Sequence, residues 1–225
     1  MLSKLLALLM ASTLVFMAIG CGSDEDDKDN NEVVLTDMPP LETRATVPGD
    51  VTSSTTSDDW TYFSFKTGTT VPAPQKNTKN WDIRFLGTKM STNGGTTADE
   101  VGSGGTGGAM IIKESDLMKV TQAPSSVYTM DVKSAIASMA SPKPVVSINQ
   151  LMTKEDESDP NADENHWYAG SGRDLNADGT KCYVIKCGDG NYARVQFTNY
   201  TKEGDNRLFT FSYNYTDQAD GRFVK

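Results

Sequence analysis

The chain contains one histidine, His166, in the segment "NHWYAGSG", and six of its ten methionines lie between Met90 and Met152. A neutral imidazole and a thioether can both bind transition-metal ions, and imidazole is also a general acid or base. His166 is therefore interpreted as a ligand, as a catalyst, or as a polar side chain beside Trp167 and Tyr168. Each methionine, taken alone, is most simply a filler of core gaps.

The other residues that could carry chemistry match no catalytic motif. The sequence lacks G-x-S-x-G, the turn that positions a hydrolase serine. "DLNADG", residues 174–179, resembles the start of a calcium-binding loop, but the twelfth position is Ile185 where that loop needs glutamate. A polar turn is the better interpretation of this segment.

Cys182 and Cys187 are the only thiols outside the N-terminal segment, and they lie five residues apart in "KCYVIKCGDG". Along one extended strand their Cα atoms would be roughly 16 Å apart, too far for a disulfide. No C-x-x-C or histidine cluster suggests a metal site. Both are predicted to be structural cysteines.

The N-terminus has the features of an export signal. Lys4 precedes an apolar run that ends in "AIGC", which resembles a bacterial lipobox, so residues 1–20 are predicted to be a lipoprotein signal peptide and Cys21 the lipidated residue. Residues 21–50 carry that cysteine and an acidic tether, and residues 51–225 form the domain. The acidic run resembles the surface-export signal of Bacteroidetes lipoproteins. We expect a lipid-anchored outer-membrane protein, held by its lipids alone and exposed at the cell surface.

The charge of the chain argues against nucleic acid as a partner. The formal net charge is −9, and loss of residues 1–20 removes one lysine and makes it −10. A protein this acidic is repelled by phosphate backbones.

Short extended segments dominate the domain and would have to position His166 and the methionines. "CYVIKCGDG" and "YARVQFTNY" predict a hairpin around "GDGN", and "WDIRFLGTKMSTNGG" predicts a strand run closed by a turn at Asn93–Gly94. In "RLFTFSYNYT" the aromatic residues alternate and should face the core. The fold class is therefore all-β, with antiparallel sheets and little helix.

Two segments have weak helical periodicity. In "MDVKSAIASMA", residues 130–140, three apolar side chains could share one helix face, and "SINQLMTKED", residues 147–156, is a second candidate. Both are candidates for short helices in a chain with little helix.

Several segments together resemble the HmuY family of haem-binding lipoproteins. In chain order they are "WTYFSFKTGTTV", "NWDIRFLGTKMSTNGG", "QAPSSVYTMDV", "CYVIKCGDGNYARVQFTNY" and "FTFSYNY". The resemblance covers roughly residues 58–216. It implies an all-β, hand-shaped fold and a hemophore-like function: binding of b-type haem without a covalent bond, and delivery to an outer-membrane TonB-dependent receptor. Host haem proteins are implied as a source of the haem. The resemblance also implies that the chain is not an enzyme.

The resemblance also suggests where haem ligands would lie. One family ligand follows the "Y-T-x-D-V" segment, here "YTMDV", and Met139 and Met152 lie after it. The second family ligand follows a Trp-containing motif, but here no Met or His follows Trp167, and His166 precedes it. Ligation of the haem iron by His166 with Met139 or Met152 is the leading hypothesis. A site with two methionines or one, and a histidine with no ligand role, are the alternatives. Met130 is expected to line the pocket.

Two further functions compete with haem acquisition. The first is an HmuY-like binding module that has lost haem ligation and binds another porphyrin, a glycan or a host protein, which the missing ligand after Trp167 favours. The second is a hydrolase, for which the sequence offers no motif.

Overall fold

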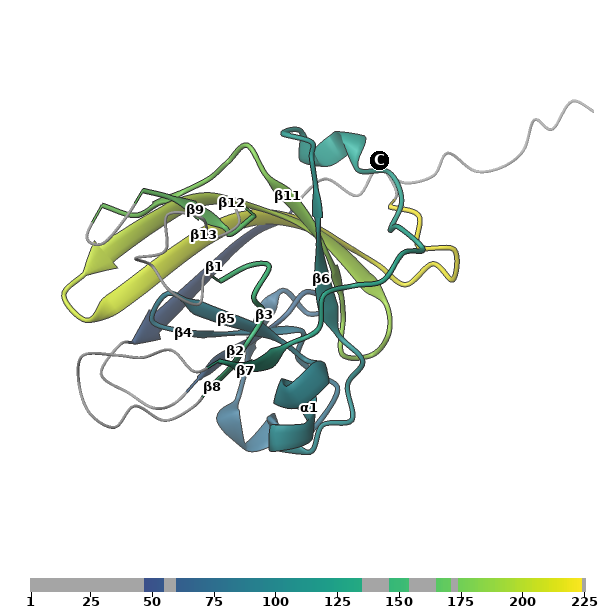
Figure 1. The fold of residues 1–225 in the computed structure, drawn as a ribbon, viewed down its shortest axis with the longest axis horizontal. Coiled ribbons are helices and arrows are strands. Elements are labelled where there is room, and N and C mark those ends of the chain that lie inside the picture. The colour runs from purple at the N-terminus through teal and green to yellow at the C-terminus, as the bar shows by residue number, and fades with distance from the viewer. Residues whose placement is uncertain (1–46, 55–59, 135–145, 154–164, 171–173, 224–225) are drawn as a thin grey trace, which may run out of the picture. The chain divides into compact units, whose positions relative to one another are not determined.

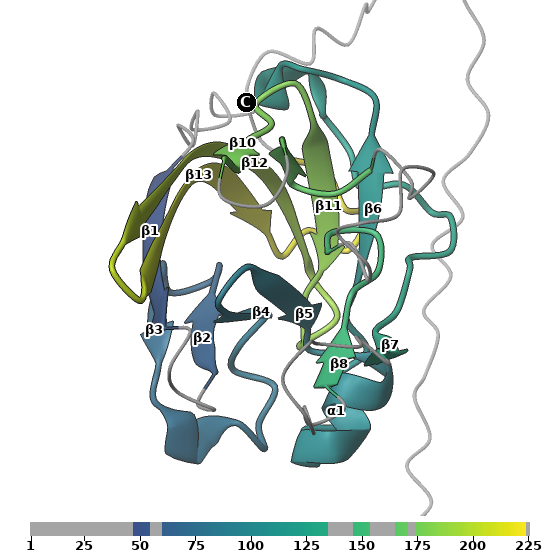
Figure 2. The same ribbon diagram turned by 60° about the vertical axis from the view of Figure 1, so that its left-hand side comes forward.

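The computed structural model describes residues 47–54, 60–134, 146–153, 165–170 and 174–223. Its larger sheet has five antiparallel strands in the order β1, β13, β12, β11, β6. Their bounds are β1 Val47–Ser54, β13 Asn206–Thr216, β12 Tyr192–Glu203, β11 Cys182–Lys186 and β6 Gly108–Ile112. Figure 2 shows this sheet curving over the smaller one.

The long hairpin of β12 and β13 is the centre of the larger sheet. Tyr192 pairs with Thr216 and Glu203 with Asn206, and the register shifts by a bulge between Phe197 and Asn199. β11 and β12 form the hairpin predicted around "GDGN", with Lys186 opposite Tyr192. The bulge between Phe197 and Asn199 increases the local twist of β12, which helps the sheet to curve.

The smaller sheet has four antiparallel strands in the order β3, β2, β4, β5. Their bounds are β3 Thr69–Val71, β2 Thr61–Ser64, β4 Ile83–Leu86 and β5 Lys89–Thr92. β4 and β5 pair with Leu86 opposite Lys89, so the chain turns at Gly87–Thr88 inside the predicted run. The all-β prediction is confirmed, with antiparallel strands in both sheets.

The main core lies between the two sheets. The aromatic side chains of β13 alternate as predicted, with Phe209, Phe211 and Tyr213 buried and Tyr215 packed against the cluster. Phe63 on β2 meets Phe211 edge-on, with ring centroids 5.2 Å apart. Burying a large aromatic side chain stabilises a fold by roughly 2–3 kcal/mol, so this seam joins the two sheets strongly.

A second, smaller cluster covers the opposite face of the larger sheet. It contains Leu117, Val120, Cys182, Val184 and Phe223. The 3₁₀ turn η2, Leu117–Lys119, supplies part of this layer. The main core and the second cluster together leave β11 buried on both faces.

The strand run ends at Asn93–Gly94 as predicted, since β5 stops at Thr92, but the chain then enters a helix and does not return as a strand. α1, Gly95–Val101, follows directly. The Asn93 side chain is fully buried and donates hydrogen bonds from Nδ2 to the carbonyl oxygens of Trp81 and Thr78, at 2.8 and 3.1 Å. A Cβ atom on Gly94 would overlap the Gly107 carbonyl oxygen, so the glycine permits a close backbone approach.

Neither segment with weak helical periodicity is helical where the structure describes it. Val132–Ser134 is strand β7, paired with β8 at Val146–Ile148, and residues 150–152 form a turn. Residues 135–145 and 154–164 lie outside the described residues. At Val132–Ser134, pairing with β8 outweighed the weak helical periodicity. Figure 1 shows α1 beside β7 and β8.

The remaining elements are short. β9, Tyr168–Ala169, pairs with β10, Asn176–Ala177, and η1, Ala73–Gln75, follows β3. Among the described residues no helix is long and apolar enough to cross a membrane.

Candidate functional site

Three segments separated in the sequence meet along the free edge of β5. Thr92 donates two hydrogen bonds to the Asp131 carboxylate, from its N–H at 2.8 Å and from Oγ1 at 2.8 Å. Met90 accepts a hydrogen bond from the Asn149 N–H at 3.0 Å and donates its own N–H to Thr153 Oγ1 at 2.8 Å. β5 is therefore the support for the segment that holds Met130 and for the turn that holds Met152.

A chain of hydrogen bonds continues from the Met152 turn to Trp167, the residue after His166. The Met152 N–H donates to the Asn149 carbonyl oxygen, and the Trp167 N–H donates to the Met152 carbonyl oxygen, each at 3.1 Å. The Trp167 indole N–H donates to the Thr88 carbonyl oxygen at 3.2 Å. The structure thus brings together the backbone segments of three predicted site residues, Met130, Met152 and His166.

The side chains of these residues differ in their exposure. Met130 is 50 % exposed, whereas Met152 is fully buried in the main core and His166 is half-buried. Met139 and the predicted lipidation site Cys21 lie outside the described residues. No ligand tests any of these assignments, so the ligand set stays a prediction.

The His166 loop is anchored on both sides. Its imidazole lies 4.3 Å from the Tyr168 ring, measured between ring centroids. Lys181 Nζ donates to the His166 carbonyl oxygen at 3.2 Å, and the Tyr183 hydroxyl donates to the Asn165 carbonyl oxygen at 2.5 Å. These bonds fix the backbone on both sides of the His166 imidazole.

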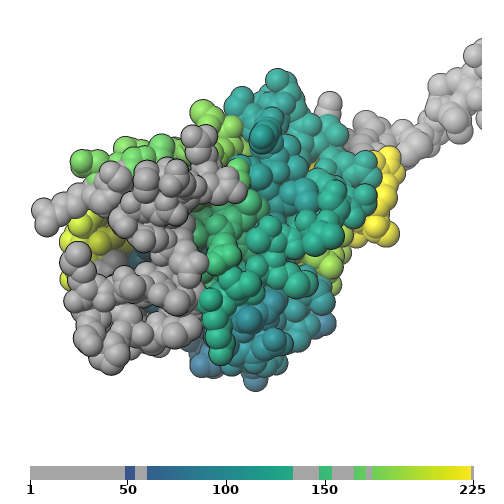
Figure 3. Space-filling model, viewed as in Figure 1, coloured from purple at the N-terminus to yellow at the C-terminus, as the bar shows by residue number. Residues whose placement is uncertain are grey.

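The segment that holds Met130 exposes unusual apolar surface. The large apolar side chains exposed among the described residues are Val127 at 92 %, Met130 at 50 % and Val132 at 38 %. All three come from six consecutive residues. A local concentration of exposed apolar side chains is typical of a binding surface. In Figure 3 the teal part of the chain, which includes this segment, borders the green part that begins at β8.

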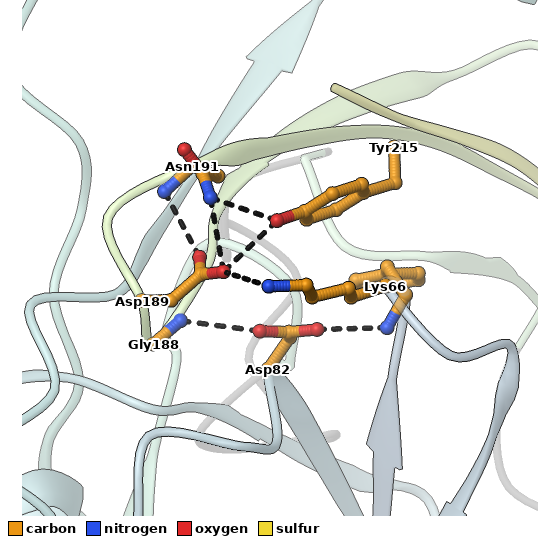
Figure 4. A network of polar contacts seen from close by, with 7 residues as sticks. Lys66, Asp82, Gly188, Asp189, Asn191 and Tyr215 are labelled. Atoms are coloured by element: carbon orange, nitrogen blue, oxygen red, sulfur yellow. Dashed lines mark hydrogen bonds and ion pairs between the residues drawn. The ribbon is translucent and has the colours of Figure 1, made fainter. Parts of the chain in front are cut away.

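The structure also reveals a cluster that sequence reasoning missed. Ligand atoms of Asp82, Cys187 and Asp189 lie within 4.8 Å of one another. Asp82 accepts hydrogen bonds from the Phe65 N–H at 2.7 Å and the Gly188 N–H at 3.2 Å, as Figure 4 shows for Gly188. Burial raises the pKa of Asp82 to about 6, and the neighbouring Asp189 charge adds to the shift.

Donors within the protein already satisfy the carboxylate oxygens of this cluster. Asp189 Oδ2 accepts from the Tyr215 hydroxyl at 2.9 Å and lies 3.9 Å from Lys66 Nζ. Asn191 donates to the same carboxylate (Figure 4). The cluster therefore joins the smaller sheet to the β11–β12 turn. No single sequence segment could reveal it, because Asp82 and Asp189 are brought together only by the fold.

A pocket of about 410 Å³ lies beside this cluster, between the β2–β3 hairpin and η1. Its lining includes Lys66, Lys79, Asp82 and Asp189 but none of the predicted haem-site residues. Both cysteines are buried and free, as predicted, with Cys187 in the main core and Cys182 in the second cluster.

The fold is similar to that of solved structures. The chain is similar to the apo HmuY analog (TFO) from Tannerella forsythia, with 20 % identity, a TM-score of 0.51, and coverage of 79 % of this chain and 100 % of that one. It is also similar to apo PinO from Porphyromonas, with 18 % identity, a TM-score of 0.50, and coverage of 78 % and 100 %. No curated protein matches the sequence.

The family model for the HmuY protein matches residues 56–213. This range includes the smaller sheet, the segments around β5 and most of the β12–β13 hairpin. It also agrees with the sequence segments that resembled the family. The chain therefore belongs to the HmuY family.

Proposed function

We propose that this protein is a surface lipoprotein that binds b-type haem and delivers it to an outer-membrane TonB-dependent receptor. The observation that carries the proposal is membership of a haem-binding family over most of the domain. Convergence of the segments of Met130, Met152 and His166 along β5 supports it. The lipobox at Cys21 supports lipid anchoring.

The ligands in this proposal are His166 with one methionine. An imidazole and a thioether are a known axial pair for haem iron, and the exposed apolar strip that includes Met130 suits one face of a porphyrin. Haem, when bound, supplies the iron, and the protein positions and shields it. Host haem proteins are the proposed source.

The experiment is a haem titration of the protein lacking residues 1–21, followed by absorption in the ferric and the dithionite-reduced state. Met130→Leu, Met139→Leu and Met152→Leu each remove a sulfur while nearly conserving volume, and His166→Phe removes the imidazole. Met110→Leu, on β6, is the matched control. We expect a saturable Soret band that the His166 variant and one methionine variant shift or abolish, and that Met110→Leu leaves unchanged.

The second candidate is an HmuY-like module that binds another ligand. The full burial of Met152 favours it, because a thioether enclosed in the main core would have to move to reach iron. Absence of a Soret band in both redox states would reject haem binding and leave this candidate.

The location is tested separately by Cys21→Ser in the full-length protein. Because the acyl chains are proposed as the membrane anchor, the variant should leave the membrane fraction, while the unchanged protein should be cleaved by protease added to intact cells. A Cys21→Ser variant that stays with the membrane would contradict lipid anchoring.

A further inference from the structure

The pocket beside the Asp82 cluster is built mainly by the smaller sheet. The turn between β2 and β3, the strand β3 and the segment from η1 to β4 line it, and Asp189 from the β11–β12 turn completes the lining. Its volume of about 410 Å³ is within the range of sites that bind small molecules. The predicted haem-site residues do not line it, so this pocket and the candidate haem site are different places in the fold.

Hydrogen bonds within the protein hold the two sides of this pocket in place. The Gly68 N–H donates to the Ser64 carbonyl oxygen at 2.9 Å, which fixes the turn between β2 and β3. In the segment from η1 to β4, the Trp81 indole N–H donates to the Lys76 carbonyl oxygen at 2.9 Å. The pocket is therefore formed before a ligand arrives, and this lowers the entropic cost of binding.

The neutral residues of the lining suit a ligand with hydroxyl groups. Thr67, Thr69 and Thr70 contribute hydroxyls, and Gln75 and Asn80 contribute amides. The hydroxyl oxygens of Thr67 and Thr69 lie 3.0 Å apart, and each of them can both donate and accept a hydrogen bond. A porphyrin or a nucleobase needs an apolar or aromatic surface to lie against, and the described lining residues include no aromatic side chain.

The charged residues of the lining favour a ligand with one negative charge. Asp82 and Asp189 already accept hydrogen bonds from the protein. The Lys66 side chain is 64 % exposed and its Nζ lies 3.9 Å from Asp189, and Lys79 forms no ion pair among the described residues. Both ammonium groups can therefore bind an anion. Because two lysines and two aspartates line the pocket, a doubly charged phosphate would be repelled more strongly than a single carboxylate.

We propose that this pocket binds an acidic sugar, a saccharide that carries one carboxylate. Lys66 and Lys79 bind the carboxylate, and the hydroxyls and amides of the lining bind the hydroxyl groups of the sugar. This ligand is additional to the haem of the proposed function, and its binding does not require haem. A monosaccharide of this kind should bind weakly, with a dissociation constant on the order of 1 mM.

The test is a titration of the purified protein, without haem, with D-glucuronate and with D-galacturonate, followed by NMR of the backbone amides. The Thr69, Thr70 and Asn80 amides should shift in a saturable way with at least one of these sugars, whereas the amides of η2 should not shift. The neutral sugars D-glucose and D-galactose should bind at least about fivefold more weakly than the matching acids. Absence of saturable shifts with both acids, or equally tight binding of the neutral sugars, would overturn the proposal.

Lys79→Gln tests the role of the lysine, and the exposure of Lys79 means that the variant should fold. It removes the positive charge and should weaken binding of the acidic sugar about fivefold. Lys202→Gln, at an exposed lysine on β12 that does not line the pocket, is the matched control and should bind as the unchanged protein does. Unchanged binding by Lys79→Gln, or the same loss in both variants, would contradict the assignment.

Acetate and inorganic phosphate separate an acidic-sugar site from a general anion site. Both anions lack the sugar hydroxyl groups that the threonines and amides are proposed to bind, so each should bind at least about fivefold more weakly than the acidic sugar. Acetate or phosphate that shifts the same amides with equal affinity would show that the pocket binds anions without recognising a sugar, and would overturn the proposal.

Discussion

Among the residues that the structure describes, Arg194 is enclosed by backbone carbonyl groups and forms no salt bridge with a carboxylate. Its side chain is fully buried, and Nη1 donates to the carbonyl oxygens of Val120 at 2.7 Å and Leu117 at 3.1 Å. The guanidinium also lies 5.3 Å from the centroid of the Phe223 ring. One side chain thus holds η2 and the C-terminal segment against β12. "YARVQFTNY" predicts a strand but does not show that its arginine is buried.

Arg194→Leu should destabilise the protein strongly. The buried carbonyl oxygens would lose their donor, and the cost of such unsatisfied groups is about 3 kcal/mol in total. Urea unfolding measures this loss. Arg222→Ala, at an arginine that is 73 % exposed, is the matched control and should cost at most about 0.5 kcal/mol. Equal losses in the two variants would contradict the assigned role of Arg194.

At the scale of elements, strands were easier to predict than the segments that connect them. The alternating aromatic residues of β13 and the turn residues between β11 and β12 are local signals, and both elements are present. α1 has no such signal, because its position depends on contacts of Asn93 and Gly94 with residues distant in the sequence. The same holds for the candidate site: the sequence suggested its residues, whereas the bonds from Asp131 and Asn149 become visible only in the fold.

Gly94→Ala should test the close approach at the start of α1. Gly94 has an extended backbone, with φ −164°, so alanine there costs no backbone strain but would overlap the Gly107 carbonyl oxygen. Such overpacking costs about 3 kcal/mol. Gly102→Ala is a useful contrast, since Gly102 has φ +68° and open space around it, and strain alone costs about 1 kcal/mol. In thermal unfolding, the midpoint temperature of Gly94→Ala should lie well below that of Gly102→Ala.

At the scale of the whole molecule, family and fold agree. HmuY proteins are a non-enzymatic haem-binding family, so the prediction that the chain is not an enzyme is confirmed. Two buried carboxyls, Asp82 and Asp131, join elements that are distant in the sequence, and burial raises the pKa of each to about 6. The domain boundaries stay a prediction, although β1 already begins at Val47.

The fold should be more stable at pH 5 than at pH 7. A raised pKa in the folded state means stability that is complete below the ordinary pKa and is lost as the pH rises through the folded pKa. Between pH 5 and pH 7 the two carboxyls together should lower the free energy of unfolding by roughly 2–3 kcal/mol. The lowered pKa values of Asp178 and Asp220 act below pH 4 and leave this range unchanged. Urea unfolding at both pH values measures the difference, and greater stability at pH 7 would contradict it.

The position of the two cysteines on β11 has a practical consequence. Cys187 lies in the layer between the sheets and Cys182 in the layer outside them, so one strand carries a chemical reporter for each layer. In a protein without residues 1–21 these are the only thiols. Reaction with a thiol reagent, followed by mass spectrometry of the two peptides, would therefore time the opening of each layer separately. If the outer layer detaches while the sheets stay joined, Cys182 will react first.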